Sequence, residues 1–249
     1  MRPHFPSRTF ITTSGAAASV GLVVLGALAA WLLRDAGPLA VDRSIADAVS
    51  DEQEDWLRRV GRVLTLPGTS LGALALALAA GCYFWISRRT LTPAVLLVVA
   101  YAGAFSTAFA LKPVVDRVAP RFWLERDSGV SFPSGHAARA AAVLGMIVVI
   151  VEIVHGRRAA LVASVVALLG IGVTVATQVY LGFHWFTGMI GGLAIATFWV
   201  AILVPIAIGR LRGPGDAVSQ RESSPPGDSW PGQKQGPIGP GSRPPGRDA

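Results

Sequence analysis

Residues 189–208 read MIGGLAIATFWVAILVPIAI and contain no charged side chain. A helix that crosses the hydrocarbon core of a bilayer needs about 20 mostly apolar residues, which is the length of this stretch. The sequence contains five more runs of this kind: residues 14–33, 68–87, 91–111, 137–154 and 159–177. Of the six, only 137–154 carries charge, at Arg139 and Glu152. Because backbone polar groups must bond internally in lipid, the runs predict an all-α membrane protein, a bundle of six transmembrane helices.

The overall composition favours the same class. Of the 249 residues, 52% are hydrophobic and 15% are charged, whereas a soluble domain carries about 25% charged residues. The formal charge of +7 is spread over small clusters between apolar runs, not gathered on the single stripe that nucleic-acid binding requires. A single cysteine, Cys82, excludes a disulfide scaffold and any multi-cysteine metal site. We therefore expect contact with membrane lipids and none with nucleic acid.

Four pairs of arginine flank the predicted helices on one side of the membrane. They are Arg2 and Arg8, Arg88 and Arg89, Arg157 and Arg158, and Arg210 and Arg212. The positive-inside rule places such clusters in the cytoplasm. We therefore expect a multi-pass protein of the plasma membrane with residues 1–13 and 211–249 inside. Residues 27–29 (ALA) resemble a signal-peptide cleavage site, but the apolar run before them is long and favours a retained anchor.

Two segments differ from the spanning helices. Residues 211–249 are rich in Gly and Pro, which predicts a disordered tail because such a chain buries too little apolar surface to offset its ordering entropy. In the outer segment 34–67, apolar residues recur at a nearly helical spacing: Ile45, Val49, Trp56, Val60 and Leu64. This spacing predicts an amphipathic helix that lies on the membrane or on the bundle.

The candidate chemistry lies in the last two outer loops. Residues 133–136 read PSGH and come directly before a predicted helix, so Ser134 can cap a helix whose free N–H groups attract an anion. Gly135 permits close approach of the backbone to that anion, and His136 can donate a proton. Lys112 ends the third predicted helix and can hold a phosphate as a point charge. The alternatives are an ordinary helix start and a lysine that reaches the lipid headgroups.

In order and spacing these residues resemble the type-2 phosphatidic-acid phosphatase family, which is related to bacterial acid phosphatases and vanadium haloperoxidases. The family signature is Lys, six residues and Arg-Pro; then Pro-Ser-Gly-His; then Ser-Arg, five residues, His, three residues and Asp. Residues 112–120 (KPVVDRVAP) resemble the first part and residues 133–136 match the second. Residues 177–188 (TQVYLGFHWFTG) resemble the third in register. The resemblance implies a phosphatase-haloperoxidase-like core within residues 14–210.

The resemblance also implies a mechanism that uses no metal or cofactor. His184 corresponds to the nucleophile that forms a phospho-enzyme, and His136 corresponds to the acid that protonates the leaving oxygen. Lys112, Ser134 and Gly135 correspond to groups that hold the phosphoryl oxygens. Such a site suits phosphoryl transfer, which depends mainly on positioning and charge stabilisation. The implied substrate is a lipid phosphate or an isoprenyl (di)phosphate.

Three positions depart from the signature. Ala119 and Gln178 stand where the family has arginine, and Gly188 stands where it has the aspartate that orients the nucleophilic histidine. Gln178 retains an amide donor for phosphate, and Arg139, three residues after His136, shares a helical face with it. We therefore expect Gln178 and Arg139 to bind phosphate; the alternative for Arg139 is a side chain that reaches the outer lipid headgroups.

Arg117 and Arg121 flank position 119 and are further candidates to replace the missing guanidiniums. The sequence then favours an outward-facing membrane phosphatase with impaired activity. The alternative is a catalytically silent homologue that binds phospholipid or phosphorylated headgroups. A transporter is disfavoured because ionisable residues inside the predicted spans are few. The sequence leaves the oligomeric state open.

Overall fold

The structure is a computed structural model that describes residues 8–50, 54–120 and 130–211. The predicted disordered tail, apart from Leu211, lies outside the described residues. Within the described part the chain forms eight α-helices and one short 3₁₀ helix, η1 (Leu66–Gly68). The α-helices are α1 (Arg8–Leu32), α2 (Ala40–Ser50), α3 (Asp55–Leu64), α4 (Ser70–Arg88), α5 (Thr92–Val115), α6 (Gly135–His155), α7 (Arg157–Tyr180) and α8 (Phe186–Leu211).

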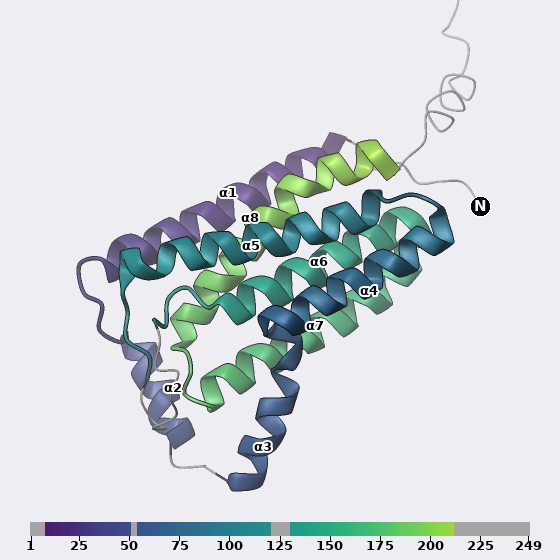
Figure 1. The fold of residues 1–249 in the computed structure, drawn as a ribbon. Helices are drawn as coiled ribbons and strands as arrows, with labels where there is room; N and C mark the ends of the chain where they lie inside the picture. The colour runs from purple at the N-terminus through teal and green to yellow at the C-terminus, as the bar shows by residue number, and fades with distance from the viewer. Residues whose placement is uncertain (1–7, 51–53, 121–129, 212–249) are drawn as a thin grey trace, which may run out of the picture. The chain divides into compact units, whose positions relative to one another are not determined.

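The predicted bundle of six membrane-spanning helices is confirmed. Helices α1, α4, α5, α6, α7 and α8 are each long and apolar enough to cross a bilayer. Figure 1 shows them running side by side, with α2 and α3 at one end of the bundle. Residues 117–120 and 130–134 belong to the connection from α5 to α6 at the α2–α3 end. Each of the six helices has one terminus at this end, because α1, α5 and α7 end there and α4, α6 and α8 begin there.

Helices α6 and α8 form the interior of the bundle. Helix α6 packs against α5, α7 and α8, and α8 also packs against α1 and α5. Helix α7 instead presents large apolar side chains outward, such as Val162 and Leu168, which are 67% and 69% exposed. A soluble protein rarely exposes so continuous an apolar surface. A bilayer accounts for it, because lipid tails solvate such side chains as well as a protein core does.

Small residues bring the inner helices close together. The ring of Trp199 in α8 lies against Gly103 of α5, where a Cβ atom would collide with it. The indole N–H of Trp199 also donates to the Thr107 hydroxyl at 3.0 Å. At Gly192 of α8, a Cβ atom would lie 2.9 Å from the Cβ of Ala137 in α6. Glycine and alanine at these contacts permit the close backbone approach that membrane helices use for packing.

The outer segment forms two helices where the sequence predicts one amphipathic helix. They are α2 and α3, and residues 51–53 between them lie outside the described residues. In α3 the predicted apolar residues Trp56 and Val60 are 57% and 40% exposed, whereas Gly61 lies against Leu181 after α7. The apolar residues Trp56 and Val60 of α3 are therefore exposed, and the helix contacts Leu181 through a glycine.

A buried ion pair joins α2 to the bundle. The guanidinium of Arg117 donates to the carboxylate of Asp42 at 2.6 Å, and both side chains are fully buried. The same carboxylate accepts the backbone N–H of Thr187 at 2.9 Å and its hydroxyl at 2.8 Å. Arg117 also donates to the Thr187 hydroxyl at 2.7 Å. Asp42 therefore holds the first turn of α8, where a negative charge is favourable.

These hydrogen bonds also control the ionisation of Asp42. Burial alone would raise the pKa of this carboxyl, but the bonds from Thr187 and Arg117 outweigh it and lower the pKa. The charged form is therefore the one that the folded protein binds.

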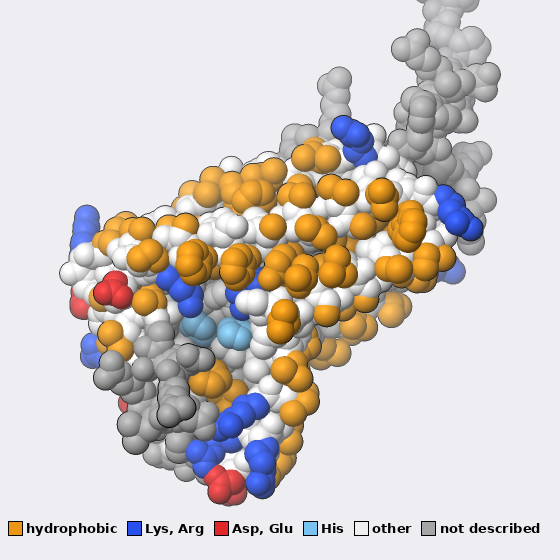
Figure 2. Space-filling view, in the orientation of Figure 1, with side chains coloured by type: hydrophobic (Ala, Val, Ile, Leu, Met, Phe, Trp, Pro, Cys, Tyr) orange, Lys and Arg blue, Asp and Glu red, His pale blue; other side chains and the backbone are white. Residues whose placement is uncertain are grey.

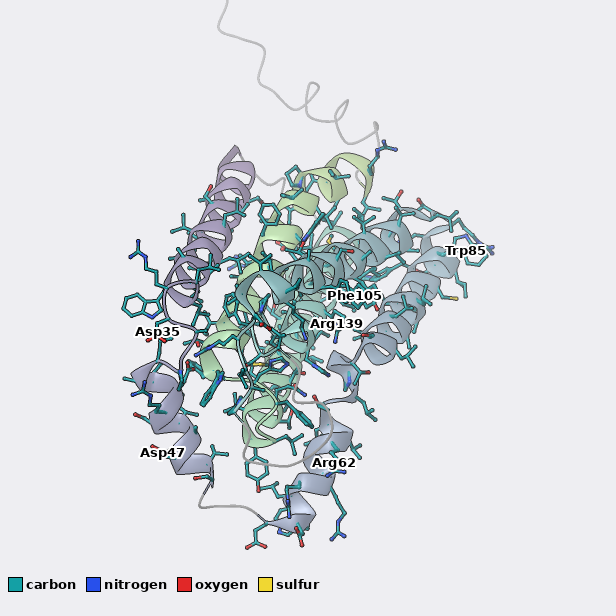
Figure 3. All side chains as sticks on the ribbon, turned by 60° about the vertical axis from the view of Figure 1, so that its left-hand side comes forward. Asp35, Asp47, Arg62, Trp85, Phe105 and Arg139 are labelled. Atoms are coloured by element: carbon teal, nitrogen blue, oxygen red, sulfur yellow. The ribbon has the colours of Figure 1, made fainter. Side chains whose placement is uncertain are left out.

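We expect Asp42→Ala to destabilise the fold by about 3–5 kcal/mol, because it leaves the buried Arg117 charge without its partner. Thermal unfolding of the purified protein in detergent measures the effect. The matched control is Asp47→Ala, on the exposed side of the same helix (Figure 3), which should leave the unfolding temperature unchanged. Equal shifts for the two variants would show that the buried pair contributes nothing to stability.

Candidate active site

Three elements bring the predicted site residues together. Lys112 lies in the last turn of α5, and His136 and Arg139 lie in the first turn of α6. His184 lies in the short connection between α7 and α8. In Figure 2, histidine side chains are open to one face of the molecule, beside Lys or Arg side chains and next to the apolar band. The chain thus collects its candidate catalytic groups at one edge of the membrane-spanning region.

The predicted helix cap at Ser134 is confirmed. Its hydroxyl accepts the backbone N–H of Ala137 at 3.4 Å at the start of α6. Its own backbone N–H donates to the carbonyl of Gly188 at 2.9 Å, so the start of α6 is fixed against the start of α8. Ser134 and Gly135 are both buried. The positive end of the α6 dipole therefore points at the site, as an anion-binding helix terminus requires.

The two histidines face each other across a narrow space. The centroids of the His136 and His184 rings are 6.1 Å apart, with an interplanar angle of 61°. His184 is buried, and His136 is partly exposed. Reacting atoms approach to about 3–3.5 Å before a bond forms. The two rings are therefore close enough to contact one small group bound beside them.

Arg139 supplies a buried positive charge next to Gly135. Its Nε and Nη2 atoms donate to the carbonyl of Gly68 at 3.3 and 3.1 Å. Its guanidinium also lies over the ring of Phe105, 5.7 Å from the centroid, in the interior of the bundle (Figure 3). The Nη1 atom lies 2.8 Å from the place where a Cβ atom of Gly135 would stand. Nη1 has no acceptor among the described residues and points at the start of α6.

The charge around these rings is positive and uncompensated. Within the described ranges, no carboxylate forms an ion pair with Lys112 or Arg139. The charges of Lys112 and Arg139 both lower the pKa of His184. A buried cation is costly without an anionic partner, and the described residues provide no carboxylate for Lys112 or Arg139. The arrangement is that of an anion site.

The sequence lacks the signature aspartate that would orient His184, and the structure shows a different partner. Its Nδ1 atom lies 2.9 Å from the main-chain carbonyl oxygen of Ser131. Burial, and then the charges of Lys112 and Arg139, lower the pKa of His184 to about 4, although the bond to Ser131 acts in the opposite direction. The ring is therefore neutral at pH 7. A carbonyl only accepts, so Nδ1 carries the proton and Nε2 keeps its lone pair.

Other predicted residues are placed differently. Gln178 is fully buried, and its amide donates to the Thr65 hydroxyl at 2.5 Å. Its amide oxygen has no partner among the described residues. Arg117 does not replace the missing arginine of position 119, because the buried pair with Asp42 occupies it. Arg121 lies outside the described residues.

Four residues that contact the site residues were not predicted from the sequence. Ser131 and Gly68 contribute main-chain carbonyls, which any residue type supplies. Asp42 and Thr65 come from the outer segment and reach the site only through the tertiary fold. Only Asp42 offered a hint, as a charged residue in a segment that must pack on an apolar bundle.

Comparison with known proteins agrees with this geometry. Residues 93–211, which contain all the predicted site residues, match the family model of the PAP2 superfamily. The chain is 29% identical over 163 residues to phosphatidylglycerophosphatase B of Bacillus subtilis, covering 63% of this chain and 78% of the relative. The chain is similar to the PAP2 superfamily over residues 93–211.

A solved PAP2 structure supports the fold in three dimensions. The crystal structure of a transmembrane PAP2-type phosphatidylglycerolphosphate phosphatase from Bacillus subtilis superposes with a TM-score of 0.66 at 25% identity. The match covers 76% of this chain and 96% of that chain. The bundle described above is therefore a PAP2 membrane fold, and the chain is a membrane protein related to lipid phosphate phosphatases.

We expect Arg139→Gln to weaken binding of vanadate, a phosphate analogue, by about tenfold to a hundredfold, because a hydrogen bond to a charged group contributes about 1.5–3 kcal/mol. Calorimetric titration of the detergent-solubilised protein measures this. The control is Arg158→Gln, at an exposed position at the other end of the bundle, which should bind vanadate normally. If the two variants bind vanadate equally well, Arg139 does not contact the anion and has only a structural role, through its hydrogen bonds to the Gly68 carbonyl.

Proposed function

We propose that this protein is a phosphatase of lipid or isoprenoid phosphates that works through a phosphohistidine on His184. The observation that carries the proposal is the pairing of His184 with His136 beside two cations that have no carboxylate partner in the described part of the chain. The relatives support the substrate class, since both are named as phosphatases of a glycerophospholipid phosphate. The edge of the apolar band is also where a lipid headgroup would lie.

The chemistry follows from the two rings. The Nε2 lone pair of His184 attacks phosphorus, and the bond from phosphorus to the ester oxygen breaks as His136 gives that oxygen a proton. Water then attacks the phosphorus of the phospho-enzyme, His136 takes a proton from the water, and the bond from phosphorus to Nε2 breaks. Inorganic phosphate and a lipid alcohol are the products. Lys112, Arg139, the Ser134 hydroxyl and the backbone N–H of Gly135 stabilise the charge on the phosphoryl oxygens.

The same site also explains why we propose reduced turnover. The two arginines of the family signature are replaced by Ala119, which is buried, and by Gln178, whose amide bonds to Thr65. Charge-assisted hydrogen bonds are about twice as strong as neutral ones. Each lost guanidinium therefore removes stabilisation of the transition state that an amide only partly restores.

We expect the purified protein in mixed micelles to release phosphate from phosphatidic acid or an isoprenyl diphosphate, below the usual enzyme range of about 1–10³ s⁻¹. His184→Ala should abolish the release. When this variant is incubated with labelled substrate, no labelled phospho-enzyme should form. Tight binding of the lipid phosphate without any release would instead identify a silent homologue that recognises headgroups.

We further propose that the site faces the outside of the plasma membrane, with both termini in the cytoplasm, as the arginine pairs indicate. To test this, Cys82 is replaced by Ser, and single cysteines are placed at the exposed positions 47, in α2, and 157, at the start of α7. A membrane-impermeant thiol reagent added to intact cells should modify position 47 and not position 157. Modification of position 157 alone would reverse the orientation.

A further inference from the structure

Gly188 and Ser131 together occupy the place where the family signature has a carboxylate. Gly188 is the third residue of α8 and is buried. A Cβ atom added to it would lie 2.5 Å from the Ser131 carbonyl oxygen, too close for any side chain. That same oxygen is the partner of His184 Nδ1 at 2.9 Å. The missing side chain therefore leaves the space that the carbonyl occupies.

Ser131 is fixed by two hydrogen bonds and by burial. Its backbone N–H donates to the carbonyl of Arg117 at 2.6 Å. Its hydroxyl accepts the backbone N–H of Trp185 at 3.1 Å, next to His184 in the chain. Its side chain and backbone are fully buried. The carbonyl is thus fixed in direction and is not available to water.

Gly188 is also fixed from the other side. Its carbonyl accepts the backbone N–H of Ser134, which begins α6 and precedes His136 by two residues. A shift of Gly188 to relieve a collision with Ser131 would therefore move the cap of α6 as well. The nucleophile and the acid depend on the same backbone contact.

We propose that the main-chain carbonyl of Ser131 is the positioning group for His184, taking the role of the signature aspartate, and that Gly188 is the residue that makes room for it. This inference rests on the proposed function, because orientation matters only if His184 attacks phosphorus. A neutral carbonyl fixes the tautomer as a carboxylate does, since it accepts a hydrogen bond from Nδ1–H and has no hydrogen of its own to donate. It adds no negative charge next to the anionic substrate.

The first test measures the tautomer directly in the unmodified protein. Nitrogen-15 NMR of the histidine rings, with the His184 signals assigned by their loss in His184→Ala, should show Nδ1 protonated and Nε2 unprotonated at pH 7. A ring protonated at Nε2, or an even mixture of tautomers, would overturn the proposal. This measurement needs no turnover, so it separates a failure of the inference from a failure of the proposed function.

The second test uses Gly188→Ala and Gly188→Asp. Both place a Cβ atom against the Ser131 carbonyl, so both should lower kcat for phosphate release by about 10²-fold or more, with KM little changed, and should mix the tautomers of His184. The matched control is Gly172→Ala in α7, where a Cβ atom meets nothing within 4 Å, and it should keep full activity.

Restored or raised activity in Gly188→Asp would overturn the inference, because the carboxylate would then be better than the carbonyl. If a Gly188 variant does not fold, the tautomer in the unmodified protein still decides the question. If the unmodified protein releases no phosphate while Nδ1 is protonated as expected, the proposed activity fails and the positioning of His184 stands.

Discussion

The buried ion pair between Arg117 and Asp42 is the contact on which the geometry of the site depends. Arg117 follows α5 and Asp42 lies in α2. The Arg117 guanidinium and the Asp42 carboxylate bind each other, and both bind Thr187 at the start of α8. The backbone carbonyl of Arg117 then accepts the N–H of Ser131, whose own carbonyl accepts His184 Nδ1. A pair of buried charges is costly unless its hydrogen bonds are satisfied. Here the bonds of the pair fix Arg117, whose backbone in turn fixes Ser131, the partner of His184.

The spanning helices were predictable because a bilayer imposes them. Residues 137–154 and 189–208 have few alternatives once their backbone must bond internally in lipid, and the structure places helices α6 and α8 there. The cap at Ser134 was predictable for a local reason, since a hydroxyl before a helical run satisfies a free N–H. The position of His184 opposite His136 followed only from resemblance to a family, because the chain separates them by a whole helical hairpin.

The rest of the site could not be read from the sequence because its contacts are carried by main-chain atoms or by distant residues. Ser131 and Gly68 act through carbonyl oxygens, which residue type does not encode. Asp42 and Arg117 are 75 residues apart, and nothing local pairs them. The contact of α3 with the bundle has a related cause: it is made at Gly61, which carries no apolar side chain, whereas the apolar Trp56 and Val60 are exposed.

Charge accounting connects the three departures from the family signature. The signature combines three cations with one carboxylate, which leaves two net positive charges around the phosphoryl group. This chain lacks two of those cations, at Ala119 and Gln178, and the carboxylate, at Gly188. Of the signature cations only Lys112 remains, and Arg139, which is not a signature position, adds a second, so the described residues again place two positive charges near His184. With a carboxylate at position 188 the net charge there would fall to one, and a phosphate dianion would be bound less well in a place with little water. A neutral carbonyl as the partner of His184 is therefore consistent with the loss of the two arginines, because it orients the nucleophile without reducing the positive charge that remains.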